Sequence, residues 1–240
     1  MLRGLFSLDN PVIKFFCLIG NLWMLNILWL VCSLPIVTLG ASTTALVYSC
    51  MKLRADEGYI FRNFFKSFKE NFKQSTILWL IYLVVGALLG LGLIFWNNYT
   101  MPGSKLIWGV VLAFSILYLI SILYVFAIQS KFVNTIKNTI KYSFLIAFTH
   151  IKETILLALI VAGVVLANMF TIFLVNFITI NVGMSIVNYW MSAHYQEIFE
   201  KYIPKKKYTS DDDYYDPVEV EDETLVDNPI ADDSSIEIEA

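Results

Sequence analysis

Charged residues are scarce in this chain and are kept out of its apolar stretches. They make up 15% of the sequence, against about 25% in ordinary globular proteins. Asp, Glu, Lys, Arg and His are absent from four ranges: 15–51, 77–96, 106–129 and 154–180. Ionisable groups at membrane depth are costly and usually mark a reaction or an ion pathway. Their absence argues against a carrier with a carboxylate proton relay and against an intramembrane metalloprotease.

Histidine and cysteine are also few, with two and three copies. His194 and Glu197 are three residues apart and supply at most half of a metal site. The cysteines have neither metal spacing nor a disulfide framework, and we interpret them as buried spectators: Cys17, Cys32 and Cys50. No catalytic triad, phosphate-binding loop or nucleotide fingerprint is present. The sequence therefore predicts no enzyme, no catalytic residue, no cofactor, no metal and no nucleic-acid partner.

Apolar residues, in contrast, are abundant, at 58% of the chain. A helix needs roughly 20 apolar residues to cross the hydrocarbon core of a bilayer, and several uncharged runs approach or exceed that length. The run 182–199 is less hydrophobic and gives a sixth candidate. We predict an all-α fold, a polytopic membrane helix bundle with five to six membrane segments.

The basic residues indicate how this bundle is oriented. All but one of the 17 Lys and Arg lie before the first apolar run or in the ranges 52–73, 131–152 and 201–207. The loop 97–105 contains only Lys105. Because cytoplasmic loops carry an excess of Lys and Arg, we predict a cell-membrane protein with its N- and C-termini in the cytoplasm.

This orientation requires the first apolar region to cross the membrane twice. The range 15–51 would form a helix of about 55 Å, which is too long for one span of a core of about 30 Å. Proline disfavours helix at the residue before it, so we predict helices at Phe15–Ser33 and Ala41–Arg54 with an outer turn from Pro35 to Gly40. The alternative is a single kinked helix with the N-terminus outside.

The turn lies in an unusual stretch, LPIVTLGASTTAL, at 34–46. Its polar or turn-forming residues are candidates for a turn or for a ligand-facing surface: Pro35, Thr38, Gly40, Ser42, Thr43 and Thr44. Ordinary packing between helices is the alternative, since small and hydroxyl residues let membrane helices approach closely. As a turn, the stretch would use the hydroxyls of Ser42 to Thr44 to cap the first turn of the returning helix.

A basic amphipathic helix is predicted directly after this region. In YIFRNFFKSFKENFKQ (59–74) the aromatic residues recur at helical spacing and most basic residues fall on other faces. This pattern is typical of a helix in the membrane interface, or the Phe face packs against the protein's own bundle. The predicted anchors are Phe61, Arg62, Phe64, Phe65, Lys66, Phe68, Lys69, Phe72 and Lys73. A similar pattern in 142–160 suggests a second unit of the same kind.

The composition changes abruptly near the end of the chain. From Tyr208 to Ala240 there are 13 Asp or Glu and no Lys or Arg. Such a segment cannot bury enough apolar surface to fold alone. We therefore divide the chain into an integral membrane helical domain, 1–204, and a disordered acidic cytoplasmic tail, 205–240.

Three stretches resemble a known family: LPIVTLGASTTAL, NFFKSFKENFKQS at 63–75 and YVFAIQSKFVNTIKNTIKYSFLIAF at 124–148. Over about residues 1–200 the chain is similar to the YesL-type family of bacterial multi-pass membrane proteins, a domain of unknown function. The resemblance implies an all-helical bundle in the bacterial cytoplasmic (plasma) membrane. It also implies an association with carbohydrate uptake and breakdown, because genes of this family tend to lie beside genes for those processes.

Two functions follow as expectations. The first is an accessory or regulatory component associated with carbohydrate uptake or utilisation, with the lipid bilayer and sugar-transporter subunits as partners. The alternative is a small facilitator, or permease, for a neutral polar solute that uses the 34–46 stretch.

Overall fold

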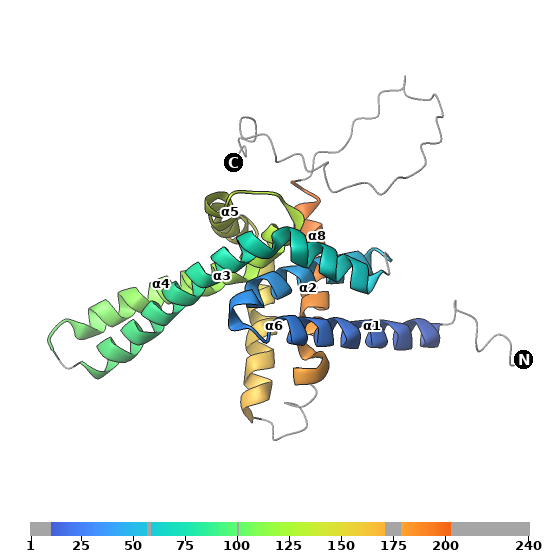
Figure 1. Cartoon of the computed structure of the whole chain (residues 1–240). Coiled ribbons are helices and arrows are strands. Elements are labelled where there is room, and N and C mark those ends of the chain that lie inside the picture. Colours follow the sequence, from blue (N-terminus) through green and yellow to red (C-terminus); the bar gives the residue numbers. More distant parts are fainter. Residues whose placement is uncertain (1–10, 57–58, 100, 171–178, 203–240) are drawn as a thin grey trace, which may run out of the picture.

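The computed structural model describes residues 11–56, 59–99, 101–170 and 179–202 of the 240-residue chain. The described residues form α-helices, one 3₁₀ turn and one π-helical turn, without a strand (Figure 1). In chain order the elements are α1 (Pro11–Cys32), η2 (Ile36–Thr38), α2 (Leu39–Arg54), α3 (Ile60–Asn98), α4 (Ser104–Lys131), α5 (Ile136–Thr149), α6 (Ile151–Phe170), η3 (Thr179–Gly183) and α8 (Met184–Phe199). The predicted all-α class is confirmed.

Five of these helical stretches are long and apolar enough to cross a membrane, which confirms the polytopic bundle. They are Ile13–Cys32, Ile36–Arg54, Ile60–Asn98, Ser104–Lys131 and Ile151–Met169. The sixth predicted segment is only a 16-residue helix, α8, in the described part of the chain. The predicted tail, 205–240, lies outside the described residues.

The first apolar region forms two helices, as predicted. Helix α1 ends at Cys32, the backbone turns at 33–35, and α2 follows the short 3₁₀ segment. The Ser33 amide still donates to the Trp29 carbonyl at 2.9 Å, whereas Pro35 has no amide hydrogen to continue the helix. The alternative of one kinked helix is therefore wrong.

Helix α2 lies at the centre of the bundle. Of the stretch of this helix that could span a membrane, 61% is buried inside the protein. The same share is 33% or less for each of the other four candidate spans. It contacts α1, α3, α4 and α8. Small side chains line it, including Gly40, Ala41, Ser42, Ala45 and Ser49, all buried. A helix with such short side chains lets its neighbours approach closely.

The closest approach is between α2 and α3, at Gly40. A Cβ atom placed on Gly40 would stand 2.5 Å from Trp79 Cβ and closer still to the Ser75 carbonyl oxygen. One turn further along α2, Thr44 Oγ1 and Ser75 Oγ share a hydrogen bond of 2.9 Å. The Trp79 indole donates to the Ile36 carbonyl at 2.8 Å. Glycine is thus required for this contact, and Gly40 is part of α2 rather than of the turn.

Helix α3 joins two predicted segments. Its 39 residues span about 58 Å at 1.5 Å per residue, and they run without a break from the basic amphipathic stretch into the apolar span. With α4 it forms a long hairpin that extends to the left in Figure 1. Gly86 faces Tyr118 and Gly92 faces Val111, but nothing lies within 4 Å of a Cβ placed on Gly90. Gly86 and Gly90 have the spacing of a small-residue packing face, but of the two only Gly86 meets α4.

The second unit differs from the first. Where α3 is continuous, the corresponding stretch is divided into α5 and α6 at His150. Helix α5 is held to α3 and α4 by a buried polar cluster. Gln129 Nε2 donates to Asn71 Oδ1 at 3.1 Å and to Gln74 Oε1 at 3.2 Å, and its Oε1 accepts from Thr139 Oγ1 at 3.3 Å.

A second polar contact holds α2 to α8, two of the helices that line the site described below. Arg54 Nη2 donates to the Tyr189 carbonyl at 2.6 Å, and its Nε donates to Ser192 Oγ at 3.3 Å. The guanidinium carbon lies 4.3 Å from the centre of the Tyr189 ring. In addition, Gln196 Nε2 donates to the Met51 carbonyl at 2.9 Å. Side chains of each helix thus bond to backbone carbonyls of the other, at Met51 of α2 and at Tyr189 of α8.

We predict that Gly40→Ala lowers the free energy of unfolding by about 1–3 kcal/mol, the usual cost of overpacking a tight contact. Gly90→Ala is the matched control. It adds the same methyl group to an open helix position, where alanine is favoured over glycine by about 1 kcal/mol. Thermal unfolding of both variants in detergent measures the difference, and equal midpoints would show that the Gly40 contact is not close.

Arg54→Met is predicted to loosen α8 from α2, because it leaves the Tyr189 carbonyl without its charged donor. Cys50 reports this opening, since it is fully buried and its Sγ lies 3.8 Å from the Ser185 carbonyl of α8. With Cys17 and Cys32 replaced by serine, maleimide should label Cys50 faster in Arg54→Met than in the wild type. Lys69→Met, at an exposed position, should leave the rate unchanged.

Candidate functional site

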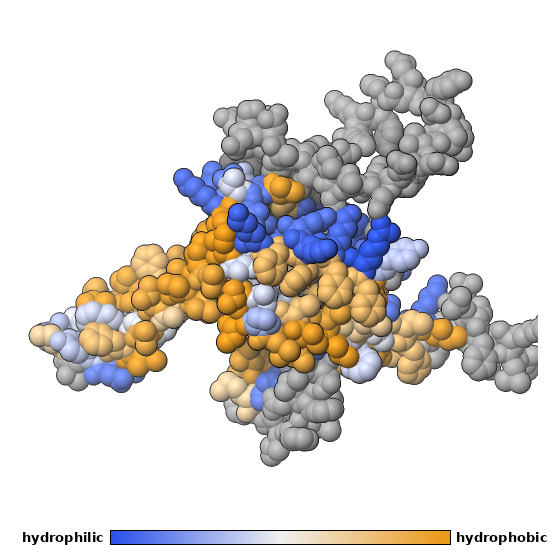
Figure 2. All heavy atoms as spheres, viewed as in Figure 1, coloured by the Kyte–Doolittle hydropathy of each residue, from blue (hydrophilic) through white to orange (hydrophobic). Residues whose placement is uncertain are grey.

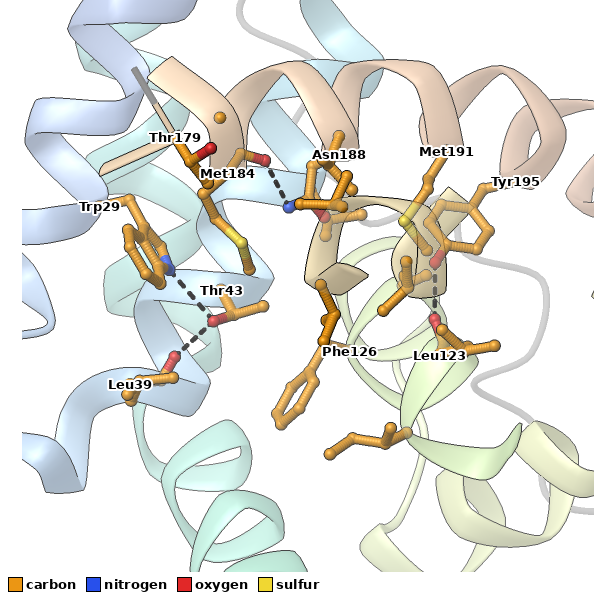
Figure 3. A pocket seen from close by; sticks show the side chains of 18 of the residues that line it. Trp29, Leu39, Thr43, Leu123, Phe126, Thr179, Met184, Asn188, Met191 and Tyr195 are labelled. Carbon is orange, nitrogen blue, oxygen red and sulfur yellow. Dashed lines mark hydrogen bonds between the residues drawn. The ribbon is translucent and has the colours of Figure 1, made fainter. Parts of the chain in front are cut away.

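A cavity of about 620 Å³ lies between the central helix and its neighbours (Figure 3). This is within the range of roughly 300–1,000 Å³ that is usual for ligand pockets. Five α-helices besides α2 contribute to its walls. The lining residues are mostly apolar and include Trp29, Leu30, Leu39, Thr43, Val47, Trp79, Leu123, Phe126, Val161, Val165, Thr179, Met184, Asn188, Met191 and Tyr195.

Two helical stripes form facing walls of the cavity. On α2 the stripe consists of Leu39, Thr43 and Val47, which are four residues apart and share one face. On α8 it includes Met184, Asn188, Met191 and Tyr195 at spacings of three and four. Arg54 lies beyond the part of α2 that lines the cavity. Its contact with α8 keeps the two stripes beside each other.

The polar groups of the cavity are largely used inside the protein. Trp29 Nε1 donates to Thr43 Oγ1 at 3.2 Å, and that hydroxyl donates in turn to the Leu39 carbonyl at 2.7 Å (Figure 3). Asn188 Nδ2 donates to the carbonyl of Met184 at 2.8 Å. A group that enters the cavity therefore meets apolar surface and few free hydrogen-bond donors.

Tyr195 and Trp79 follow the same pattern. The Tyr195 hydroxyl donates to the Leu123 carbonyl at 2.6 Å (Figure 3), and the Trp79 indole donates to Ile36, as described above. A polar solute would lose its hydrogen bonds to water on entering and find few replacements, at a cost of about 1–3 kcal/mol for each unsatisfied group. The cavity is suited to an apolar group.

Of the six residues predicted for a turn or a ligand-facing surface, only Thr43 lines this cavity. Pro35 is exposed in the turn, and Gly40 is buried against α3. Thr38 donates to the carbonyls of Cys32 and Pro35 at 2.6 and 2.8 Å. Its hydroxyl therefore stabilises the turn itself.

The predicted helix caps are wrong. No side chain caps the start of α2. Instead the hydroxyls bond backwards within the helix, with Thr44 Oγ1 donating to the Gly40 carbonyl at 2.9 Å. Ser42 Oγ lies 3.1 Å from the Leu39 carbonyl and 2.6 Å from Ser33 Oγ of the turn. Packing between helices, one of the three alternatives, accounts for Ser42 and Thr44.

The predicted interfacial anchors divide into two groups. Phe64 is fully buried against Leu25, Leu46 and Cys50, and Phe68 packs against the same cluster. The packing alternative is correct for these two rings. Lys66 is half-buried, and the other anchors are exposed: Phe61, Arg62, Phe65, Lys69, Phe72 and Lys73. Contact of the exposed rings with lipid stays a prediction.

The few cysteines and histidines are dispersed. Cys50 is buried, but Cys17 is exposed and Cys32 is half-buried, so the expectation of buried spectators is correct for Cys50 alone. Among the described residues, no three His, Cys, Asp or Glu side chains are grouped to hold a metal. His150 Nε2 lies 3.1 Å from the Tyr202 hydroxyl. Burial and the neighbouring Lys201 lower the pKa of this histidine, against the opposing effect of Glu153 and Glu197.

Most residues of the site carry no signal in the sequence. Trp29 and Tyr195 were not singled out, because nothing in a single sequence distinguishes a cavity-lining aromatic residue from a core one. Arg54 was predicted only as a loop cation, because nothing in the sequence pairs it with Tyr189 and Ser192, which lie more than 130 positions further along the chain. Gln129 gave a usable signal, since it is a lone amide at the end of an apolar run.

Comparisons with known proteins agree with the sequence resemblance. Residues 22–93 match a family model described as "Protein of unknown function, DUF624". The chain is 28% identical to the "Uncharacterized protein YesL" of Bacillus subtilis (strain 168) over 163 residues, which cover 66% of this chain and 77% of the relative. No solved structure matches the chain. The two matches confirm the resemblance drawn from the sequence, to a YesL-type family of membrane proteins with a domain of unknown function.

Proposed function

We propose that this protein is a non-enzymatic accessory or regulatory component of the bacterial cytoplasmic membrane, associated with carbohydrate uptake or utilisation. It acts by contact with other membrane proteins, and sugar-transporter subunits are the proposed partners. The observation that supports contact over transport is the apolar cavity beside α2, in which Trp29, Thr43, Asn188 and Tyr195 make hydrogen bonds within the protein. The link to carbohydrate rests on the family resemblance.

The cavity also bears on the alternative function, a facilitator for a neutral polar solute. Such a solute needs a series of donors and acceptors that replace water along its route, because unsatisfied polar groups are costly in hydrocarbon. Thr43 is the one residue of the proposed ligand-facing set that lines the cavity, and its hydroxyl already accepts from Trp29 and donates to Leu39. The geometry therefore favours the accessory function.

The rim of the cavity is where a partner would make contact. Leu30 on α1 and Val165 on α6 both line the cavity, and 44% and 53% of their surfaces are exposed. Aliphatic side chains of a neighbouring membrane helix can pack into such a surface, where van der Waals contact drives association.

We further propose that the basic ends of the helices face the cytoplasm. Lys52 and Arg54 close α2, Lys131 closes α4, and Lys137 and Lys141 lie on α5. In the same orientation, the turn at 33–38 and the connection between α3 and α4, with Lys105 at the start of α4, lie outside. The positive-inside rule supports this arrangement.

Site-specific photocrosslinking tests the accessory function. A photoreactive amino acid at Leu30 or Val165 should crosslink to the same membrane protein in native membranes, and mass spectrometry should identify it as a subunit of a sugar-uptake system. The matched control is Leu91, an apolar α3 residue that is 66% exposed and does not line the cavity. It should yield no such product.

Two results would contradict this proposal. One is identical crosslinking from all three positions, which would show that the cavity rim is not special. The other is sugar uptake by liposomes that contain the purified protein, lost in Thr43→Val but kept in Thr44→Val. Thr44 is the control because its hydroxyl faces Ser75 instead of the cavity. That result would favour the facilitator.

Cysteine labelling in intact cells tests the orientation. Cys17 and Cys32 are first replaced by serine, whereas Cys50 is fully buried and can stay. A single new cysteine is then placed at one of three exposed positions, Val37, Lys69 or Lys105. A membrane-impermeant maleimide should label positions 37 and 105 from outside, and position 69 only after the cells are opened. Labelling of position 69 in intact cells would reverse the orientation.

A further inference from the structure

Seven lysines gather on one side of the molecule, here called the basic face. They come from four elements and the residues beside them: Lys66, Lys69, Lys73, Lys137, Lys141, Lys152 and Lys201. Figure 2 shows hydrophilic side chains concentrated there, over α5 and the end of α8, above a largely apolar body. Lys66 is half-buried and the other six are exposed.

Contacts between the helices hold these lysines on a common surface. Gln74, next to Lys73, donates to the Asn134 carbonyl that precedes α5, and the Gln129 cluster joins the same two helices. These contacts bring the part of α3 that carries Lys73 close to the start of α5, which carries Lys137. At the other end of the face, His150 Nε2 lies 3.1 Å from the Tyr202 hydroxyl, which brings Lys201, the residue before Tyr202, close to the start of α6.

The charge on this face is only partly balanced within the described residues. Four acidic side chains stand among the seven lysines: Glu70, Glu153, Glu197 and Glu200. A surface with excess positive charge attracts anionic groups over about a Debye length, roughly 10 Å at 0.1 M salt. The basic face is therefore suited to an anionic partner.

The chain itself supplies such a partner at this place. The last described residue, Tyr202, is next to Lys201 on the basic face. Residues 211–223 contain eight Asp or Glu and no base. The nine residues from Tyr202 to Asp211 reach at most about 30 Å, which exceeds the length of α5, about 21 Å for 14 residues. The linker alone is therefore long enough to span a distance equal to the length of α5.

We propose that the acidic segment 211–223 binds in cis to the basic face. Anionic lipid headgroups are the competing partner, since each Lys near a membrane surface contributes about 1 kcal/mol of attraction to them. Tethering favours the segment, because a short linker gives an effective concentration in the millimolar range. The segment thereby shields the basic face, and its charge controls access of anionic lipids or proteins to that face. This regulation is independent of the proposed role in carbohydrate uptake.

Lysine footprinting on the full-length protein in zwitterionic nanodiscs tests the proposal. Acetylation of Lys69 and Lys141 by sulfo-NHS-acetate is compared between the wild type and a neutralised variant with D211N, D212N, D213N, E221Q, D222N and E223Q. Both lysines should react several-fold more slowly in the wild type at low salt. The difference should vanish at about 1 M salt, where the Debye length is roughly 3 Å.

Two controls distinguish binding of the acidic segment from a general change in lysine reactivity. Lys105, exposed at the start of α4 and at the far end of the α3–α4 hairpin, should react equally in both proteins. Ser234→Ala with Ser235→Ala changes the same tail without changing its charge and should keep the protection. Equal rates at Lys69 and Lys141 in wild type and neutralised variant would overturn the proposal. So would protection that appears only when anionic lipid is added, because the lipid would then be the partner.

Discussion

The close approach of α3 to the thin central helix α2 is the contact on which the rest of the bundle depends. Gly40 leaves no room for a Cβ atom beside the Ser75 backbone and Trp79. Because α2 carries mainly small residues along this part, α1, α4 and α8 also reach it. In hydrocarbon the hydrophobic effect does not drive helices together, so close packing of backbones and side chains must do so. A bulkier α2 would push apart the helices that enclose the cavity.

The hydroxyl groups of α2 show how a polar sequence is accommodated at this depth. Thr43 and Thr44 donate to the carbonyls four residues earlier, so their hydroxyls are satisfied without water. Each also has a second partner on another helix, Trp29 or Ser75. These side chains therefore cost little to bury and make contacts between helices specific. Because these hydroxyls are already hydrogen-bonded within the protein, the cavity offers few free polar groups, although Thr43 lines it.

The sequence predicted the architecture well, because the constraints on a membrane protein act locally. Segment length, the scarcity of charge and Pro35 together placed the break between α1 and α2 to within a few residues. Patterns that depend on helix partners were less reliable. The spacing of Gly86 and Gly90 suggested one packing face, yet Tyr118 meets only Gly86. Likewise, the Phe residues of 61–72 share one helical period but differ in burial. Only Phe64 and Phe68 pack against the cluster that contains Leu25 and Cys50.

The site was beyond the reach of sequence analysis for a related reason. A cavity is a gap between elements, and its walls come from residues that are more than 100 positions apart, such as Thr43 and Tyr195. Their types, aromatic and aliphatic with a few hydroxyls, are those of any membrane core. What distinguishes them is that Arg54 and Gln196 hold α8 beside the end of α2, while the stripes on the two helices face one another further along. The polar contacts at the end of α2 thus hold in place the part of α8 that carries Met191 and Tyr195 of the cavity wall.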